Sequence, residues 1–235
     1  MGFYRGPNIS TNGLVLALDA ASNRSYPGSG TTWFDISGNQ NNFSIVASAY
    51  NTSGPKYMDF NGSYGCAKSA SDISLSDAEG ATYIVWTRVL NNAGNWRTLT
   101  RSYVNDHHVI ILAGGNTLGM YDNDSSGFIS SGYTITNLPS FNGWACLYWR
   151  WQRLTPYYEF SYNDSPGTIR GSISDANARY NRGFGSIGAY HNGNTTPSDA
   201  SQYWGDIAVF YAYNRRLTDS ELLQYFNATR TRFGI

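Results

Sequence analysis

The sequence predicts an all-β protein, a sandwich of two antiparallel sheets that ends in one short helix. Short apolar and aromatic segments recur along its 235 residues, and Gly, Asn, Ser and Pro separate them. Aromatic residues make up 16% of the chain, and such residues favour strands. Many short strands separated by turn residues indicate a sandwich or a barrel. The length suits one large all-β domain and is too short for two.

The predicted strands are short apolar segments that follow one another between turns. The first is Leu14–Asp19, and the turn-rich stretch 22–42 after it is expected to be a loop. Gly205–Tyr213 carries bulky residues at successive positions, which is typical of a strand buried on both faces. The other predicted strands are 56–60, 81–89, 96–101, 108–112, 117–121, 144–151, 157–162, 168–173 and 185–190.

One helix is predicted near the C-terminus. Residues Thr218 to Glu221 have the pattern of a capping box, in which the Thr hydroxyl and the Glu carboxylate each accept from the other residue's backbone amide. The residues that follow give one apolar face at helical spacing: Leu222, Leu223, Tyr225 and Phe226. We therefore expect this helix to dock on the sandwich.

Charge is scarce and balanced. Charged residues make up 14% of the chain, with 16 cationic and 16 anionic side chains. A neutral chain predicts neither nucleic acid nor an anionic membrane as a partner, and no segment has the apolar length of a membrane span. The N-terminus begins without an apolar run, so no signal peptide is expected and synthesis in the cytoplasm is predicted.

The two cysteines, Cys66 and Cys146, lie far apart and lack metal-ligand spacing. A pair of core thiols is the first interpretation, and a disulfide is the second.

Two stretches of the chain, one near each end, carry a family resemblance. The first consists of NGLVLALDA (12–20) and YPGSGTTWFDISGN (26–39). The second consists of WGDIAVF (204–210) and YNRRLTDSE (213–221). They resemble the laminin-G-like and pentraxin-like domains, of the concanavalin A-like jelly-roll type, found in bacteriophage tail-fibre and other virion proteins. The resemblance spans residues 12–235. It implies a two-sheet antiparallel jelly roll whose work is binding or structural more often than catalytic.

The predicted domain organisation is an extended N-terminal arm, residues 1–12, and a sandwich domain, residues 13–235. The arm contains Gly6-Pro7, which disfavours helix. A segment of this kind docks on a sheet edge or in a groove of a partner, and a locally packed terminus is the alternative. The predicted assembly contacts are Phe3, Tyr4, Arg5 and Ile9.

The carboxylates do not form a hydrolytic pair in the sequence. Retaining glycosidases need two carboxylates about 5 Å apart, and Glu79, Glu159 and Glu221 are the only glutamates. No predicted strand carries the alternating carboxylates of the sandwich glucanases. The nucleophile elbow of esterases and the phosphate-binding loop are also missing from the sequence. We therefore expect a protein that is not an enzyme.

One segment has metal character. Residues 122–127 match the first half of a calcium loop, with candidate oxygen ligands at Asp122, Asp124 and Ser126 and a Gly at the sixth position. Tyr133 stands where the bidentate Glu is expected. The alternative is a hairpin turn, since Asn, Asp and Gly tolerate positive φ. No cofactor is required by the sequence, and Ca²⁺ is the one ion it suggests.

Clustered aromatic residues suggest a sugar-binding surface. An exposed Trp or Tyr stacks on the apolar face of a pyranose, and polar neighbours bind its hydroxyl groups. The alternative is that these rings pack the core. The predicted sugar contacts belong to one hairpin, with Trp149, Trp151 and Tyr157, and to one loop, with Tyr190, His191, Asn192 and Asn194.

These observations lead to three functional hypotheses, given in order of preference. The first is a non-enzymatic protein of the virion surface, of the tail-fibre or capsid-decoration type, which binds other virion proteins, a host-surface glycan or further copies of itself. The second is a free lectin-like carbohydrate-binding module. A glycoside hydrolase ranks last because the carboxylate pair is missing.

Overall fold

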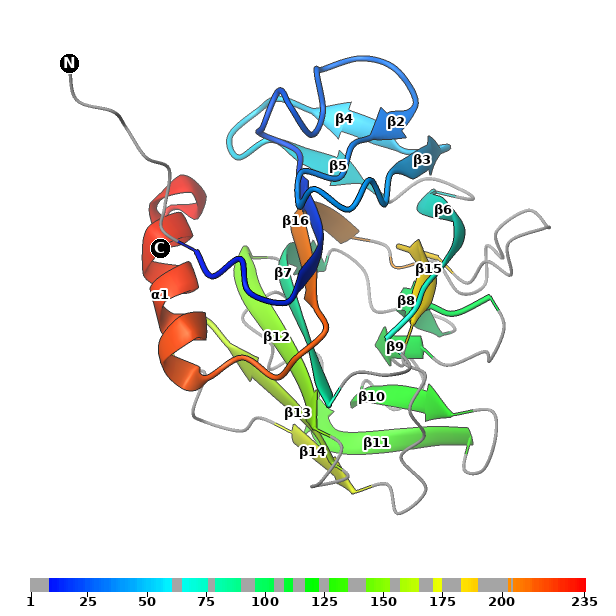
Figure 1. The fold of residues 1–235 in the computed structure, drawn as a ribbon, viewed down its shortest axis with the longest axis vertical. Helices are drawn as coiled ribbons and strands as arrows, with labels where there is room; N and C mark the ends of the chain where they lie inside the picture. The colour runs from blue at the N-terminus through cyan, green and yellow to red at the C-terminus, as the bar shows by residue number, and fades with distance from the viewer. Residues whose placement is uncertain are drawn as a thin grey trace.

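The structure is a computed structural model. It describes residues 9–60, 65–75, 79–89, 96–103, 108–111, 117–122, 127–134, 143–152, 157–164, 171–174, 183–189, 203 and 205–235. Within these residues, the strands form two antiparallel sheets of eight strands each, and one α-helix lies against the first sheet (Figure 1). The predicted fold class, a two-sheet antiparallel sandwich with a C-terminal helix, is confirmed.

The first sheet, sheet A, has the strand order β14-β13-β12-β7-β16-β5-β4, with β1 paired to β16. Sheet B has the order β11-β10-β9-β8-β15-β6-β3-β2. The strands of sheet A are β1 (Leu14–Asp19), β4 (Ala49–Asn51), β5 (Tyr57–Asp59), β7 (Gly80–Val89), β12 (Ala145–Gln152), β13 (Tyr157–Tyr162), β14 (Gly171–Ser174) and β16 (Gly205–Tyr213). Those of sheet B are β2 (Thr32–Trp33), β3 (Phe43–Val46), β6 (Cys66–Ile73), β8 (Arg97–Arg101), β9 (His108–Ile111), β10 (Thr117–Asp122), β11 (Gly127–Thr134) and β15 (Phe184–Ile187).

The main core lies between the two sheets. Alternate residues of each strand point into it because side chains of a strand alternate between its two faces. On β12, Leu147, Trp149 and Trp151 belong to this core. The ring of Trp149 lies 4.5 Å from that of Tyr83 and 5.5 Å from that of Tyr158, between centroids. Each large aromatic side chain of this kind buries a large apolar area.

A second core lies between the opposite face of sheet A and the C-terminal elements, α1 (Asp219–Thr229) and the short 3-10 helix η3 (Arg230–Phe233). The ring of Trp86 stacks on Phe233 at 3.9 Å. The buried helix residues are Leu222, Tyr225 and Phe226. The prediction that Leu223 shares this apolar face is wrong, since Leu223 is exposed outside the buried face of the helix. All nine residues of β16 are buried, because this strand lies between the two cores, as its sequence predicts.

The predicted capping box begins the helix. The Thr218 hydroxyl accepts from the Glu221 amide at 3.2 Å, and the Glu221 carboxylate accepts from the Thr218 amide at 2.9 Å. Arg215 donates to the same carboxylate. The hydrogen bond from Arg215 is the main reason that the pKa of Glu221 falls to about 2. The start of α1 is therefore fixed by hydrogen bonds as well as by packing.

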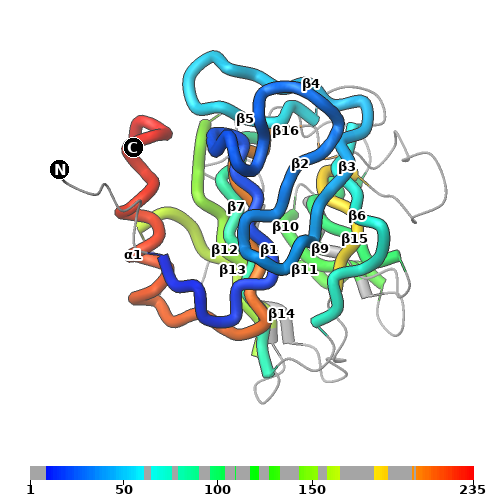
Figure 2. The backbone as a smooth tube through the Cα atoms, turned by 45° about the horizontal axis from the view of Figure 1, so that its top comes forward, coloured from blue at the N-terminus to red at the C-terminus, as the bar shows by residue number. Residues whose placement is uncertain are grey.

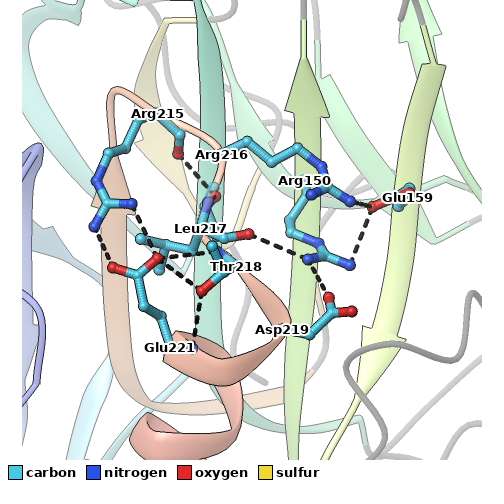
Figure 3. A network of polar contacts seen from close by, with 9 residues as sticks. Arg150, Glu159, Arg215, Arg216, Leu217, Thr218, Asp219 and Glu221 are labelled. Atoms are coloured by element: carbon cyan, nitrogen blue, oxygen red, sulfur yellow. Dashed lines mark hydrogen bonds and ion pairs between the residues drawn. The ribbon is translucent and has the colours of Figure 1, made fainter.

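A buried ion-pair network joins this end of α1 to sheet A (Figure 3). Arg150 on β12 and Glu159 on β13 are only 2% and 4% exposed, and they lie 3.1 Å apart. Arg216 contacts the same carboxylate at 2.5 Å, and Arg150 also contacts Asp219 of α1 at 2.5 Å. The charge of the buried Glu159 carboxylate is thus compensated by two guanidinium groups, one of them buried as well.

The N-terminal segment runs beside α1 and β16 (Figure 2). Ile9 packs against the second core. Tyr213 donates to the carbonyl of Ser10 at 3.0 Å, and Arg215 donates to the carbonyl of Asn12 at 2.8 Å. The last residues of the predicted arm are therefore packed on the sandwich, and Ile9 is engaged within the chain. Phe3, Tyr4 and Arg5 lie outside the described residues.

The loop after β1 is held by one carboxylate. Asp35 accepts hydrogen bonds from the amides of Ala17 at 2.9 Å, Ser37 at 2.8 Å and Asn41 at 3.0 Å. The amide group of Asn41 donates back to the carbonyl of Val15 at 2.8 Å. These contacts give the WFDISGN segment a structural role, which is to close the edge of β1.

Both cysteines are free and buried, so the interpretation as core thiols is confirmed. Cys66 lies on sheet B and Cys146 on sheet A. Burial raises the pKa of the Cys66 thiol to about 12. Among the described residues, no helix has both the length and the apolar character needed to cross a bilayer.

Candidate functional site

The outer face of sheet B, which points away from the main core, carries an aromatic cluster. On β10, Leu118 and Met120 belong to the main core. Because side chains of a strand alternate between its two faces, the alternate positions Gly119 and Tyr121 face outward. Phe128 on β11 lies opposite Tyr121 in the antiparallel register and therefore shares this outer face.

Trp96, directly before β8, completes the cluster. Its ring lies 5.6 Å from Tyr121 at an interplanar angle of 89° and 5.2 Å from Phe128 at 68°, between centroids. All three residues are half-buried. We call Trp96, Tyr121 and Phe128 the aromatic patch. They come from three different strands or strand ends, so the backbone of sheet B fixes their relative positions.

Gly119 makes room for the patch. A Cβ atom at this position would lie 2.5 Å from Cζ of Phe128, so the ring of Phe128 rests against the backbone of β10. Any larger residue would displace that ring. A glycine in a strand marks a place where another group approaches the backbone closely, and here that group is an aromatic ring.

Polar residues continue the row that begins at Tyr121. The register places His108 beside Tyr121, then Arg101, Ser186 and Lys68 on successive strands. Arg101 donates from Nη1 to the carbonyl of Ser102 at 2.9 Å, and Ser186 donates to the carbonyl of Ala189 at 2.8 Å. Lys68 is half-buried, whereas Arg101 and Ser186 are buried. The patch is thus the aromatic end of a row with cationic and hydroxyl groups.

A bulge in β6 is locked by Tyr103. From Lys68 to Ile73, β6 advances five residues while β15 advances two, from Ser186 to Phe184. The Tyr103 ring lies over Gly185, and its hydroxyl lies 2.5 Å from the Gly185 carbonyl oxygen. Asp72, within the bulge, accepts from the Tyr103 amide at 2.8 Å. Burial raises the pKa of the Tyr103 hydroxyl, which stays protonated and able to donate. These contacts hold the end of β8 in place.

This arrangement offers a rigid surface for a flat, partly apolar ligand. Half-exposed aromatic rings on strands cost little conformational entropy on binding because their positions are already set. A pyranose ring has an apolar face that stacks on such rings and hydroxyl groups that pair with polar neighbours. The surface therefore has the chemistry of a sugar-binding site.

The structure corrects part of the predicted sugar site. Trp149 and Trp151 are 2% and 1% exposed and belong to the main core, so the prediction that they stack on a sugar is wrong. The opposite side of β12 offers no ligand surface either, since Tyr148 and Arg150 face the helix. The side chain of Tyr157 and the residues Tyr190, His191, Asn192 and Asn194 lie outside the described residues.

The predicted calcium loop lies largely outside the described residues, as do Asp124, Ser126 and the side chain of Asp122. Asp122 ends β10 and pairs with Gly127 at the start of β11, which agrees with the hairpin interpretation. Among the described side chains, no group of three or more His, Cys, Asp or Glu residues is placed to hold a metal ion. Calcium stays a prediction of the sequence.

Glu159 and Glu221 have structural roles. Glu159 is paired with Arg150 and Arg216, and Glu221 caps the helix. Both carboxylates are therefore engaged in holding α1 on sheet A. Glu79 lies exposed beside the first residue of β7.

The sequence reasoning missed all three members of the aromatic patch. Their proximity depends on the pairing of β8, β9, β10 and β11, which no local pattern reveals. One local signal was available: in Leu118-Gly119-Met120-Tyr121, strict alternation separates Tyr121 from two apolar core residues.

Comparison of the sequence with protein-family models and with curated proteins gives no match. Comparison of the structure with solved structures gives clear likenesses at low identity. The binding domain of botulinum neurotoxin DC, in complex with SialylT, aligns with a TM-score of 0.61 at 14% identity over 93% of this chain and 52% of the toxin chain.

Two further likenesses have the same character. Botulinum neurotoxin type C, described as a toxin whose cell entry depends upon interaction with two ganglioside molecules, is one of them. Its structure aligns with a TM-score of 0.59 at 15% identity over 93% of this chain and 51% of the toxin chain. Trypanosoma rangeli sialidase aligns with a TM-score of 0.59 at 13% identity over 94% of this chain and 33% of the other.

The chain thus spans about half the length of the toxin chains and about a third of the sialidase. At these identities the likeness concerns the fold alone. It agrees with the sequence resemblance on the architecture, since these chains contain jelly-roll domains of the concanavalin A-like type. The chain therefore has the fold of a concanavalin A-like sandwich.

Proposed function

We propose that this chain is a carbohydrate-binding domain without catalytic activity, and that a sugar ring binds at the aromatic patch. The observation that carries the proposal is the cluster of three half-exposed rings, Trp96, Tyr121 and Phe128, on the outer face of sheet B. Aromatic residues gathered on one rigid, half-exposed face supply the stacking that recognition of a pyranose needs.

The polar row beside the patch supports the same proposal. Lys68 of β6 is a half-buried cation in the row that starts at Tyr121. A cation of this kind pairs with sugar hydroxyls or with the carboxylate of an acidic sugar. The toxin structures of similar fold are described with a sialylated ligand and with gangliosides, which motivates testing sialylated glycans first.

The absence of catalysis is part of the proposal. Glu159 and Glu221 are held by arginines that fix the C-terminal helix, on the far side of sheet A from the patch. A general acid must be free to move a proton at the reacting atom, and these two carboxylates are engaged elsewhere.

Placement on a virion surface stays a prediction of the sequence resemblance. It is compatible with glycan binding, because a virion protein that recognises a host glycan needs a surface of this kind. The sugar-binding role is the part that the aromatic patch supports.

A glycan array tests the proposal directly. Wild-type protein is expected to retain at least one class of glycan, and Trp96→Ala or Tyr121→Ala should weaken that signal by about tenfold or more, the loss of one stacking contact. Phe34→Ala is the matched control, because Phe34 is 41% exposed and follows β2, at the opposite edge of sheet B from the patch.

Two outcomes would contradict the proposal. One is that the wild type retains no glycan from the array. The other is that both patch variants bind as the wild type does, with unchanged melting temperatures. A loss shared by Phe34→Ala would also count against it, because that change leaves the patch intact.

A further inference from the structure

The outer face of sheet B carries a second group of polar side chains, near the edge formed by β2. The register pairs Thr32 of β2 with Ser44 of β3, and Ser44 with Lys68 of β6. Phe43 and Ala67, which precede Ser44 and Lys68, belong to the main core. Because side chains of a strand alternate between its two faces, the three polar residues face outward. We call Thr32, Ser44 and Lys68 the lysine edge.

The polar groups of the lysine edge are available to a ligand. Ser44 is exposed, and Thr32 and Lys68 are half-buried. Within the described part of the chain, no hydrogen bond or ion pair engages the two hydroxyl groups or the ammonium group. The ammonium group has three donors, and each hydroxyl group donates and accepts. Since adjacent strands lie about 4.8 Å apart, the three groups follow one another over about 10 Å of the sheet surface.

The charges around the lysine edge favour an anionic ligand. The strands β2, β3, β15 and β8 contain no carboxylate. The row that crosses them contains two cations, Lys68 and Arg101, and the side chain of Arg101 is buried, so Lys68 presents the positive charge to solvent. Cys66, two residues before Lys68, stays neutral because burial raises the pKa of its thiol to about 12.

The two carboxylates nearest in sequence to the lysine edge are engaged by backbone amides. Asp35, in the loop after β2, accepts from the amide of Ala17 on β1 at 2.9 Å. Asp72, in the bulge of β6, accepts from the amide of Tyr103 at 2.8 Å. Neither of these described carboxylates forms an ion pair with Lys68, so the charge of the ammonium group is uncompensated by a direct partner.

The lysine edge and the aromatic patch lie at the two ends of one row. From Lys68 the register leads across β15, β8 and β9 to Tyr121, which is four strand spacings or about 19 Å. The side chains of Ser186 and Arg101, which lie between these ends, are buried. A single sugar ring is too small to contact both Lys68 and Tyr121, so a glycan that reaches both is an oligosaccharide.

We infer that the lysine edge is an anion subsite for the acid group of a glycan, a carboxylate or a sulfate ester, while another sugar of the same chain stacks on the aromatic patch. The inference rests on the proposed function and names the class of glycan, an acidic oligosaccharide. Lys68 pairs with the acid group, since its ammonium is a compact charge with three donors. The hydroxyl groups of Ser44 and Thr32 bind hydroxyl groups of the same sugar ring.

The test uses the fact that the chain contains only two lysines, Lys56 and Lys68. Both are half-buried, and Lys56 directly precedes β5 of sheet A. In the full chain with ¹³C-labelled lysine, Lys56→Gln and Lys68→Gln assign the side-chain signals in ¹H–¹³C NMR spectra. The probes are the methyl glycoside of glucuronic acid, a sulfated methyl glucoside and the neutral methyl glucoside. Sodium acetate and sodium sulfate at the same ionic strength are the controls for charge alone.

We expect an acidic glycoside to shift the Lys68 signals with an affinity in the millimolar range, typical of a few weak contacts, and to leave the Lys56 signals in place. The neutral glucoside lacks the charge and the simple salts lack the ring hydroxyls, so each should cause a smaller shift. Added sodium chloride should weaken the response, because salt screens charges at the surface. The stronger of the two acidic probes identifies the acid group as a carboxylate or a sulfate.

Variants on the glycan array separate the charge from the hydroxyl groups. Lys68→Gln should weaken the retention of acidic oligosaccharides by about tenfold, the loss of one charge-assisted hydrogen bond, and leave neutral glycans unaffected. Lys68→Arg should keep most of the binding, because it keeps the charge. Ser44→Ala should weaken the same signal by about fivefold without loss of the fold, since Ser44 is exposed. Lys56→Gln is the matched control and should bind as the wild type does.

The two proposals fail in different ways. If neither acidic glycoside shifts the Lys68 signals more than acetate or sulfate does, or if Lys68→Gln retains acidic glycans as the wild type does, the lysine edge is not a subsite for sugar acids. An equal loss in Lys56→Gln would assign the effect to net charge and also overturn the inference. A Lys68 response together with a Trp96→Ala variant that binds normally counts against the aromatic patch and against a glycan that joins the two ends.

Discussion

The two outer faces of the sandwich carry the same kinds of residues, but these residues are buried on one face and partly exposed on the other. On sheet A, rings and arginines such as Trp86 and Arg150 are sealed under α1 and η3. On sheet B, Trp96, Tyr121 and Phe128 remain half-exposed on the strand surface. The difference lies in what covers each face, so an aromatic residue in a strand becomes core or contact surface according to the third layer of the fold.

The covered face also contains the only strongly buried ion pair among the described residues, Arg150 with Glu159. Burying a charged pair is costly unless further hydrogen bonds satisfy it. Here Asp219 and the carbonyl of Leu217 are further partners of the arginine, and both belong to the start of the helix or the residues before it. The ion pair therefore specifies where α1 docks, while the apolar residues supply most of the stabilisation.

The largest expected effect comes from breaking the apolar contact of the helix. Leu222→Ala removes a side chain with no exposed area, and we expect a loss of about 4 kcal/mol of unfolding free energy, in the upper part of the range for buried Leu. Leu223→Ala is the matched control on the next residue, which is 38% exposed. Its effect should stay within about 0.5 kcal/mol, as for surface positions.

Chemical denaturation at neutral pH measures both variants. Equal losses for Leu222→Ala and Leu223→Ala would show that the helix packs through another face. Two variants that both unfold like the wild type would show that α1 contributes no stability, which contradicts the second core.

The next effect concerns the buried charge. Glu159→Gln removes the carboxylate shared by Arg150 and Arg216, and we expect a loss of about 3 kcal/mol. The expected loss is near the lower end for buried pairs because Arg150 keeps Asp219 as a partner. The double variant Arg150→Met with Glu159→Leu should recover most of the loss, since an apolar pair carries no desolvation cost.

Denaturant unfolding of the single and double variants gives the comparison. Recovery in the double variant would confirm that the loss arises from an uncompensated arginine. If Glu159→Gln unfolds like the wild type, solvent reaches the pair and the burial of this network is wrong.

The sequence predicted the strands of the main core well because their signals are local. The strands β7, β12 and β16 are long and apolar, and their predicted bounds agree with the observed ones to within a residue. Five strands were missed: β2, which lies in the stretch expected to be a loop, and β3, β4, β6 and β11. The first three have only two to four residues, and Ser, Lys, Asp and Gly interrupt β6 and β11. In β6 these polar residues form the bulge that Tyr103 locks, so the irregular pairing explains the missing pattern.

The site was harder to predict because exposure depends on contacts distant in sequence. Alternation correctly separates Trp149 and Trp151 from Tyr148 and Arg150, but it does not say which set faces the other sheet. In the structure both sets are covered, one by sheet B and one by α1. The capping box could be read directly, since all of its atoms come from residues 218–221.

The smallest predicted effect is a pH dependence at the start of α1. On folding, the pKa of the Glu221 carboxyl falls from 4.5 to about 2, chiefly because Arg215 donates hydrogen bonds to it. A carboxyl with a lowered pKa in the folded state contributes stability that is complete above the unfolded pKa. This contribution is lost as the pH falls from about 4.5 to about 2, where the folded carboxyl also becomes protonated.

Because Arg215 and Glu221 are 27% and 22% exposed, solvent screening limits the expected contribution to about 1 kcal/mol. Glu221→Gln keeps the shape and removes the titration, so the difference in unfolding free energy between it and the wild type should shrink as the pH falls through this window. Other carboxyls titrate equally in both proteins and cancel in that difference. A difference that stays constant from neutral pH to about pH 2 would show that the cap acts through shape alone, and that the charge of Glu221 adds nothing to the anchoring of the helix.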